Sequence, residues 1–370
     1  MRIVHVTDTY LPRLGGIELH VHDLVAQQRL LGHDAVVLTR APTGAGPDGP
    51  LGEPDDVPVV RLRRTAGAGR LTAELAAADV VHCHSSVLSP LAWTAARRAP
   101  AAGVPVVVTM HSVVQDASWV RSGLRAVVAA VGPDVTWAAV STVAATALQP
   151  LVPRPVLVLP NGIDPAAWTP RAGADRPPAG APVTIVTAGR FAARKRVLPF
   201  VDVLADVRRR VGPAVALRAV LVGDGAQREP VRRRLRALRI DGWVDLPGRL
   251  TRPQIDDLYA GADIFVAPAR LESFGLAALE ARCAGLPVVA LARAGVGEFV
   301  RDGVEGLLAG DDRDLARATA ALVTDAALRG RIRAHNASTP TTLGWAHVVD
   351  RCLSVYAVAG ASDRGMLVSH

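Results

Sequence analysis

Short apolar runs alternate with longer amphipathic stretches along most of the chain. This alternation is typical of βαβ units and parallel sheets. In the first half it predicts strands at residues 2–6, 34–38, 57–62, 80–84, 104–109, 136–140 and 156–159, and helices at 16–31, 90–99 and 141–148. In the second half it predicts strands at 183–188, 216–222, 242–246, 264–267 and 287–291, and helices at 196–210, 226–238, 252–260, 275–284 and 314–324.

A stretch rich in Pro, Gly and Ala at residues 165–182 interrupts this pattern and is the best candidate for a linker. A chain of 370 residues is also long for a single core. We therefore predict an α/β protein with two doubly wound domains, at residues 1–168 and 169–345, followed by a C-terminal segment at 346–370. Because open α/β sheets bind ligands at the carboxyl ends of their strands, we expect an active site in a cleft between the domains.

Composition adds one unusual feature, a single lysine, Lys195, among 42 basic residues. An ammonium group is a compact point charge and a guanidinium is a planar fork, so a site that needs the first does not accept the second. Chance survival of one surface lysine explains the count equally well. The neighbours of Lys195 must decide between these interpretations.

The formal net charge of +8 lies in the C-terminal half, because residues 1–170 contain 13 arginines and 13 acidic residues. Aromatic residues make up only 4% and no nucleic-acid-binding motif occurs, which argues against nucleic acid as a partner. The positive charge of the C-terminal half is explained at least as well if this half binds anionic phosphates or rests on an anionic lipid surface.

The cysteine pattern favours a reducing cytosol. Cys83, Cys283 and Cys352 are far apart and show no spacing typical of a zinc site. The N-terminus shows no secretory signal, and no apolar run reaches the about 18 residues of a membrane span. We therefore expect a cytoplasmic protein that is at most peripheral to the inner face of the cell membrane.

The most informative motif places Glu272 and Glu280 eight positions apart in residues 270–281. If a helix begins near Phe274, its exposed N–H groups lie between the two glutamates and suit a phosphate. A carboxylate also accepts hydrogen bonds from vicinal hydroxyls. Alternatively, Glu272 caps the helix and Glu280 is a solvated surface residue. The apolar stretch around Glu280 favours a ligand, because burying an unpaired carboxylate is costly.

In this motif the sequence resembles the retaining, nucleotide-sugar-dependent glycosyltransferases of the GT-B fold (family 4-like), whose hallmark is Glu-x7-Glu. The resemblance covers nearly the whole chain, from Gly15-Gly16 through residues 160–164 to the region of Trp345. It implies that Glu280 binds the ribose and that Glu272 contacts the donor hexose. It also implies that the backbone amides of Phe274, Gly275 and Leu276 lie near the sugar or the diphosphate.

The second motif of the resemblance is Gly189-Arg190 with Lys195 five residues later, directly after a predicted strand. In the family this pair of cations is understood to neutralise the donor diphosphate, where charge builds up as the glycosidic bond breaks. Arg196 departs from the family, which usually has glycine there, so the first helical turn could differ in shape. The alternative is that Arg190 and Lys195 are surface charges.

Further candidates come from other strand ends. Gly15 and Gly16 precede the first predicted helix, and the resemblance puts Gly16 beside the diphosphate, although a plain turn explains the glycines as well. His111 ends a predicted strand, where a neutral imidazole could bind a sugar hydroxyl. Arg249 and Leu250 occupy the place where family members contact the base.

These motifs predict a retaining glycosyltransferase that moves a hexose from a UDP- or GDP-sugar to a hydroxyl of a glycan, glycolipid or small molecule. The predicted catalytic residues are Arg190, Lys195, Glu272 and His111. We expect neither a cofactor nor a metal, because the cations compensate the charge and no Asp-x-Asp is present. A GT-B epimerase and a non-catalytic nucleotide-sugar sensor are the alternatives.

Two expectations concern surfaces of the first domain. By resemblance, the C-terminal helix near residues 347–359 crosses back onto this domain. Five apolar residues, Trp119, Val120, Leu124, Val127 and Val128, with two arginines, Arg121 and Arg125, could rest on a bilayer and reach a lipid acceptor. A helix buried in the core is at least as good an interpretation.

Overall fold

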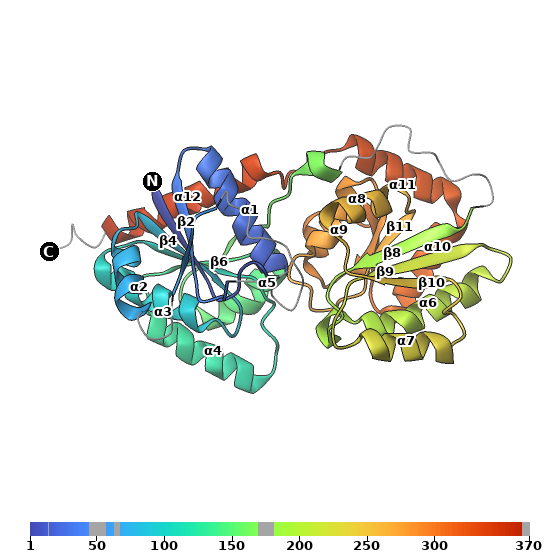
Figure 1. Cartoon of the computed structure of the whole chain (residues 1–370), viewed down its shortest axis with the longest axis horizontal. Helices are drawn as coiled ribbons and strands as arrows, with labels where there is room; N and C mark the ends of the chain where they lie inside the picture. Colours follow the sequence, from blue (N-terminus) through green and yellow to red (C-terminus); the bar gives the residue numbers. More distant parts are fainter. Residues whose placement is uncertain (14, 44–56, 63–66, 169–180, 365–370) are drawn as a thin grey trace. The chain divides into compact units, whose positions relative to one another are not determined.

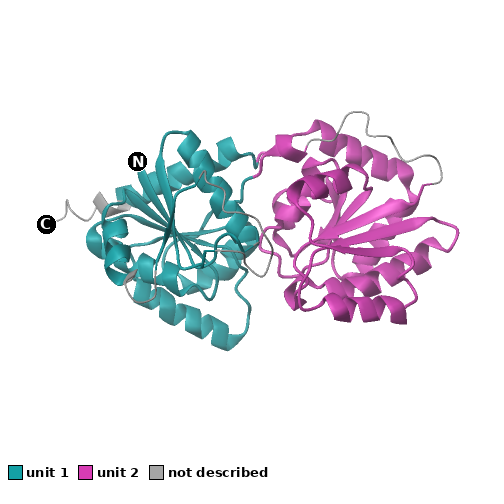
Figure 2. Cartoon of the chain, in the orientation of Figure 1, with its two compact units in different colours: residues 1–162, 343–370 teal, residues 163–342 magenta. Residues whose placement is uncertain are grey.

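The computed structural model describes residues 1–13, 15–43, 57–62, 67–168 and 181–364, and divides the chain into two compact units (Figure 2). Unit 1 comprises Met1–Gly162 and Leu343–His370, and unit 2 comprises Ile163–Thr342. The predicted boundaries, after residues 168 and 345, lie a few residues further along the chain. Most of the predicted linker at 165–182 lies outside the described residues.

Unit 1 contains a seven-stranded parallel sheet with the order β3-β2-β1-β4-β5-β6-β7 (Figure 1). Its strands are β1 (Arg2–Thr7), β2 (Asp34–Thr39), β3 (Val59–Arg61), β4 (Val80–Ser85), β5 (Val106–Met110), β6 (Thr136–Ala139) and β7 (Leu157–Val158). Its helices are α1 (Gly16–Leu30), α2 (Gly67–Ala76), α3 (Pro90–Arg98), α4 (Ser118–Val131), α5 (Thr142–Leu148) and the C-terminal α12 (Trp345–Arg364). The strand order reverses between β1 and β4.

Unit 2 repeats this topology with a six-stranded parallel sheet in the order β10-β9-β8-β11-β12-β13. Its strands are β8 (Val183–Ala188), β9 (Leu217–Val222), β10 (Val244–Gly248), β11 (Ile264–Ala267), β12 (Val288–Leu291) and β13 (Gly306–Ala309). Its helices are α6 (Val197–Val211), α7 (Arg228–Ala237), α8 (Arg252–Ala260), α9 (Leu276–Cys283), α10 (Asp312–Thr324) and α11 (Ala326–Ser338). Both units are doubly wound, as predicted.

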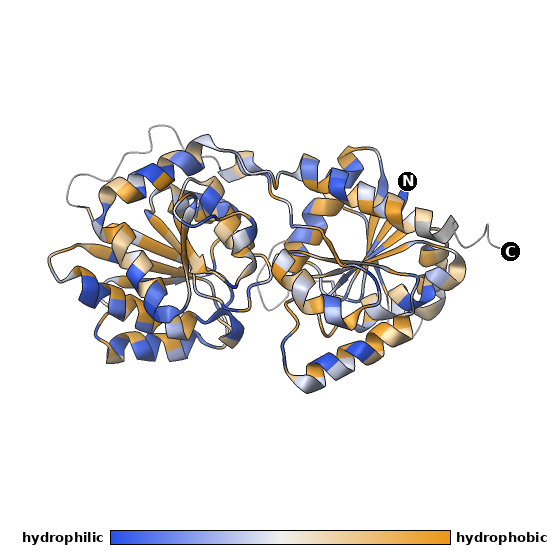
Figure 3. Cartoon of the chain, turned by 180° about the vertical axis from the view of Figure 1, so that it is seen from behind, coloured by the Kyte–Doolittle hydropathy of each residue, from blue (hydrophilic) through white to orange (hydrophobic). Residues whose placement is uncertain are grey.

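The strands of both sheets are mainly hydrophobic, whereas hydrophilic and hydrophobic residues alternate along the helices that cover them (Figure 3). This is why the apolar runs located the strands so well. The sequence did not predict α2, α11 or β13. Among the described helices, none combines the length and the hydropathy needed to cross a membrane.

Helix α4 corrects part of the bilayer hypothesis. Val120, Leu124 and Val128 are buried in the core of unit 1, and Val127 packs against that core. The prediction that these side chains face a bilayer is therefore wrong. Only Trp119 of the five apolar residues is largely exposed, at 77%.

The two faces of the unit 1 sheet differ in polarity. Helices α2 to α5 cover a face that is mainly apolar. Under α1 and α12 the other face combines apolar side chains with a group of five buried histidines, which are His5, His20, His82, His84 and His111, while a sixth buried histidine, His22 of α1, contacts Tyr10. Strand alternation produces this pattern, because His82 and His84 are two positions apart on β4 and point to the same face.

Burial lowers the pKa of all five imidazoles below the ordinary 6.5, and neighbouring histidines lower it further for three of them. The pKa of His5 falls to about 4 and that of His111 to about 3. The five rings are therefore neutral in the folded unit near pH 7.

These shifts predict an acid-labile unit 1. Below about pH 6.5 these histidines bind protons in the unfolded chain but not in the folded unit, and this favours unfolding. Their effect on the free energy of unfolding is therefore absent above pH 6.5, and the stability of the unit falls as the pH decreases towards 4 to 3. Each histidine contributes a slope of up to about 1.4 kcal/mol per pH unit. Urea unfolding followed by tryptophan fluorescence should show this loss between pH 7.5 and 5.

A pair of variants checks the cause. His20 packs its ring on Trp345, with 5.6 Å between ring centroids, and His20→Phe removes one titrating group while keeping a ring there. The slope of the free energy of unfolding against pH should decrease by about the contribution of one histidine. The control His33→Gln, at a half-buried histidine, should leave the slope unchanged. A stability that is constant from pH 7.5 to 5 would contradict this account.

Candidate functional site

The two predicted cations and Glu272 lie at the carboxyl edge of the unit 2 sheet. Strands β8 and β11 are neighbours at the point where the strand order reverses. Arg190 and Lys195 follow β8, and Glu272 follows β11. This is the place where an open α/β sheet binds ligands.

Lys195 and Glu272 form an ion pair at this edge. The Nζ atom of Lys195 lies 2.5 Å from Oε2 of Glu272, although the residues are 77 positions apart. The side chains are 30% and 15% exposed, so the pair is shielded but accessible. The two residues predicted to contact diphosphate and hexose are thus adjacent.

Arg196 directly follows Lys195 and adopts a left-handed conformation, with φ of 56°. A non-glycine residue there is uncommon and needs support. Asp312 supplies it by accepting two hydrogen bonds from the guanidinium, at 2.8 and 2.6 Å, and the carbonyl of Pro268 accepts a third at 3.0 Å. The predicted difference in the first helical turn therefore takes the form of a braced arginine, after which α6 begins at Val197.

The segment of Arg190 is fixed to the end of β9. The N–H of Gly189 donates to the carbonyl of Val222 at 3.0 Å, and the N–H of Phe191 donates to that of Asp224 at 2.8 Å. Gly223 has a φ of 133°, and a Cβ atom there would overlap the carbonyl of Gly189. Glycine in the turn at 223–225 thus allows the ends of β8 and β9 to approach closely.

Gly275 shapes the entrance to α9. Its φ is 98°, and a Cβ atom there would lie 2.8 Å from Cγ2 of Val296, so both the conformation and the space favour glycine. Phe274 is buried against Phe299, with 5.5 Å between ring centroids. Leu276 then begins the helix, whose first N–H groups have no intrahelical acceptor.

Glu280 lies within α9 and is partly exposed, between buried Leu279 and buried Ala281. Its charge acts on Tyr259, whose pKa is raised first by burial and then by Glu280. Glu280 is thus neither fully buried among apolar residues nor a fully solvated surface residue, and the binding of a ligand by its carboxylate stays a prediction.

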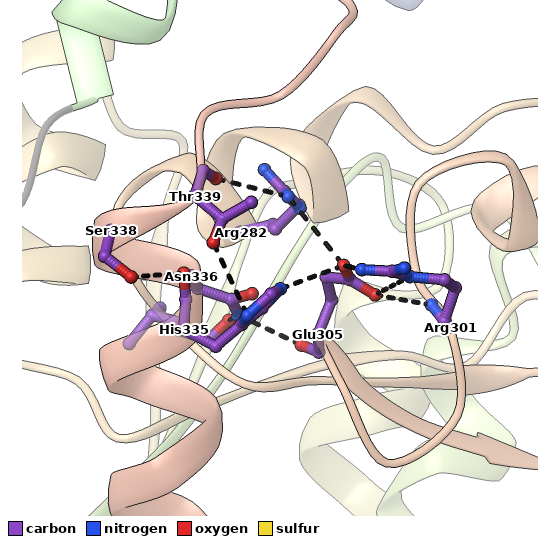
Figure 4. A network of polar contacts seen from close by, with 8 residues as sticks. Arg282, Arg301, Glu305, His335, Asn336, Ser338 and Thr339 are labelled. Atoms are coloured by element: carbon purple, nitrogen blue, oxygen red, sulfur yellow. Dashed lines mark hydrogen bonds and ion pairs between the residues drawn. The ribbon is translucent and has the colours of Figure 1, made fainter.

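A polar network braces the C-terminal end of α9 (Figure 4). Buried Arg282 lies 4.0 Å from the carboxylate of Glu305, which also accepts hydrogen bonds from Arg301 and from His335 of α11. Burial alone would raise the pKa of Glu305, but these partners, Arg301 foremost, lower it to about 2. Asn336 adds bonds to the carbonyls of residues 286 and 305. The helix that carries Glu280 is thus fixed at its far end.

Arg249 and Leu250 follow β10 at the same edge. The N–H of Gly223 donates to the carbonyl of Gly248 at 2.7 Å, which links the ends of β9 and β10. Arg249 is exposed and Leu250 is half-buried. The position agrees with a base-binding segment, although β10 lies two strands from β8.

In unit 1, Gly15 and Gly16 form the start of α1. In the structure the buried carboxylate of Glu18 lies against Gly15, where a Cβ atom would clash with it. Arg13 lies 3.6 Å from this carboxylate. Glu18 is a feature that the sequence argument missed, although an acidic residue in a first turn is a familiar signal.

His111 follows β5 and is buried and neutral, as expected for a hydrogen-bonding imidazole. Its Nε2 lies 3.0 Å from Nδ1 of His84, so it is part of the buried histidine group. His82 and His84 are not among the predicted site residues, and no local sequence pattern connects them with His5. Their contact depends on the register of β1 against β4, in which His5 is opposite His82.

Three of these histidines, His5, His82 and His84, have ring nitrogens within 4.8 Å of one another, close enough for a metal ion. All six of their ring nitrogens have hydrogen-bond partners within unit 1, which are each other, Gln28, Tyr356, Thr109 and His111. A hydrogen-bond network therefore accounts for the cluster.

Two family models match the chain. The model described as "Glycosyltransferase Family 4" matches residues 14–167, and that described as "Glycosyl transferases group 1" matches residues 182–325. Each match covers most of one unit.

Individual relatives agree with these matches. A glycogen synthase of Mycobacterium tuberculosis is 29% identical over 98% of this chain and 96% of its own length. A D-inositol 3-phosphate glycosyltransferase of Actinosynnema mirum is 32% identical over 85% of this chain and 81% of its own. The crystal structure of HepE from Anabaena in complex with UDP and glucose has a TM-score of 0.78 at 20% identity, covering 96% of this chain and 99% of that one. The fold is therefore GT-B.

Proposed function

Because the chain belongs to the group 1, family 4 glycosyltransferases, we propose that it transfers a hexose from a nucleoside diphosphate sugar to an acceptor hydroxyl and retains the anomeric configuration. The observation that carries this proposal is the ion pair between Lys195 and Glu272 beside the N-terminus of α9. A cation for phosphate, a carboxylate for hydroxyls and helix N–H groups are the groups that a sugar diphosphate requires.

Each predicted residue then has a task in binding the donor. Arg190 and Lys195 compensate the diphosphate charge, and Glu272 accepts hydrogen bonds from the hexose. Glu280 accepts hydrogen bonds from the ribose hydroxyls, for which its accessible carboxylate is suited. The amides of residues 274–276 bind next to the diphosphate, and Arg249 and Leu250 contact the base. In unit 1, Gly15 and Gly16 are assigned to the diphosphate and His111 to a hexose hydroxyl.

The reaction needs no enzyme nucleophile in this proposal. The bond between the anomeric carbon and the β-phosphate oxygen breaks, and the acceptor oxygen forms the new bond on the same face of the sugar. The acceptor proton passes to the departing phosphate oxygen, whose charge Arg190 and Lys195 stabilise. Because the two cations supply this charge, the proposal requires no metal and no cofactor. UDP and glucose in the HepE structure support a UDP-hexose donor over a GDP-sugar.

We extend the proposal to a lipid-linked acceptor, reached at the inner face of the cell membrane. Exposed Trp119 and exposed Arg125 on α4 support it, because tryptophan and arginine suit the interface of an anionic bilayer. The free, buried thiols of Cys83, Cys283 and Cys352 fit a reducing cytoplasm.

Donor binding should raise the thermal stability. A UDP-hexose at 100 times its Kd should stabilise the folded chain by about 2.7 kcal/mol, and a screen of UDP- and GDP-sugars by thermal shift identifies the base and the sugar. Glu280→Ala should weaken donor binding about tenfold by loss of a charge-assisted hydrogen bond. The control Glu229→Ala, at an exposed residue of α7, should bind normally.

Incubation without acceptor separates the alternatives. A transferase should release hexose slowly, and NMR of the first product should show the anomeric configuration of the donor. An isomerised sugar nucleotide would instead indicate an epimerase. Binding of the donor without turnover, whether or not candidate acceptors are present, would indicate a sensor. Either of these two results would contradict the proposed transfer reaction. A Glu280→Ala variant with unchanged donor affinity would contradict the role of Glu280 in donor binding.

Membrane binding is tested with vesicles of anionic lipid at low salt. The protein should co-sediment, and Trp119→Ser should reduce binding about tenfold, because this side chain supplies much of the exposed apolar area of α4. Leu30→Ser, which removes an equally exposed side chain at the end of α1, should have no effect. Absence of co-sedimentation would remove the support for a lipid acceptor and leave a soluble glycan or small molecule.

A further inference from the structure

A buried chain of four side chains runs from α1 to His111. Oε1 of Gln28 lies 2.7 Å from Nε2 of His5, Nδ1 of His5 lies 2.9 Å from Nε2 of His84, and Nδ1 of His84 lies 3.0 Å from Nε2 of His111. All four residues are buried. We call this set, Gln28, His5, His84 and His111, the histidine relay.

Each neutral imidazole in the relay has one donor and one acceptor nitrogen, so the direction of one hydrogen bond determines the next. Gln28 supplies the direction. Its Nε2 donates to the hydroxyl of Tyr356 in α12, at 3.2 Å, which leaves its Oε1 to accept from His5. The Nδ1 of His5 must then accept from Nε2 of His84, and the Nδ1 of His84 must accept from Nε2 of His111.

We propose that Gln28, oriented by Tyr356, sets the tautomer of His111 through this relay, so that Nε2 of His111 carries the proton and Nδ1 is the acceptor. Gln28, His5 and His84 are then positioning residues. An acceptor nitrogen pairs with a hydroxyl but not with an ether oxygen or a fluorine, since these groups only accept. In the relay, Nδ1 of His111 can therefore accept a hydrogen bond but cannot donate one. The role of this tautomer in donor turnover rests on the proposed function.

Two features make the relay behave as one unit. The first is burial, which keeps all three rings neutral near pH 7 and so excludes the doubly protonated ring that would break the chain of directions. The second is a branch through Tyr356, whose hydroxyl lies 2.8 Å from Nδ1 of His82, while Nε2 of His82 lies 2.7 Å from Oγ1 of Thr109. A reversed relay requires the Gln28 amide to turn over and this branch to reverse with it.

The tautomers can be observed directly. In protein labelled with ¹⁵N-histidine at pH 7.5, long-range ¹H–¹⁵N correlation spectra distinguish a protonated Nε2 from a protonated Nδ1. We expect protonated Nε2 on His5, His84 and His111. A protonated Nδ1 on His111, a doubly protonated ring, or shifts typical of metal-bound nitrogen would overturn the inference.

Variants test whether Gln28 is the origin of the direction. Gln28→Met keeps the length of the side chain but removes the anchor, so both tautomers of His111 should become populated. Tyr356→Phe, which frees the Gln28 amide to turn over, should have the same effect. It serves as the test if Gln28→Met does not fold. Gln27→Met makes the identical change at the neighbouring half-buried position of α1 and should leave the spectrum of His111 unchanged. An unchanged tautomer in both relay variants would overturn the inference.

Donor turnover gives a second, separate reading. Gln28→Met should lower kcat/KM for the donor about tenfold, as expected for one misaligned hydrogen bond, and Gln27→Met should not. A shifted tautomer with normal turnover would uphold the relay and remove His111 from the proposed function. The predicted tautomers in a protein that turns over no sugar nucleotide would uphold the relay while the proposed function fails.

Discussion

The ion pair between Lys195 and Glu272 is the contact on which the site of unit 2 depends. It joins the segments after β8 and β11 and holds an ammonium and a carboxylate side by side. An ion pair this accessible contributes only about 1 kcal/mol or less, so a diphosphate and a sugar hydroxyl can replace its two halves at little cost. The pair therefore pre-positions both groups without competing strongly with a donor. The bracing of Arg196 by Asp312 keeps the lysine segment in place.

The two units share one topology but satisfy their central polar groups differently. Unit 2 concentrates charge at its sheet edge and supports it with ion pairs, including the Glu305 network behind α9. Unit 1 instead carries uncharged histidines in its interior, held neutral by burial and connected by hydrogen bonds. Accessible cations can bind an anionic ligand directly. A buried neutral imidazole can only donate a hydrogen bond from one ring nitrogen and accept one at the other.

Sequence reasoning located most strands, because parallel strands buried on both faces are continuous apolar runs. It also found Lys195 and Glu272, since each follows such a run at a recognisable spacing. It could not foresee the histidine relay, which depends on the register of β1, β4 and β5 and on a glutamine in α1. It could not determine how far Glu280 is buried, because an apolar neighbourhood in sequence does not say which side of a helix is covered. The left-handed Arg196 and the carboxylate of Glu18 over Gly15 depend on tertiary contacts that no local pattern contains.

The central claim is that Lys195 acts through the shape and reach of its ammonium group, and the most direct measurement is donor turnover by Lys195→Arg. This variant keeps the positive charge but replaces a point charge by a planar fork. The account predicts a loss of about 100-fold in kcat, the usual consequence of misplacing one group that stabilises the departing charge. Arg194→Lys, which adds a lysine at the exposed neighbouring position, should turn over normally. Unchanged turnover in Lys195→Arg would mean that the single lysine survived by chance.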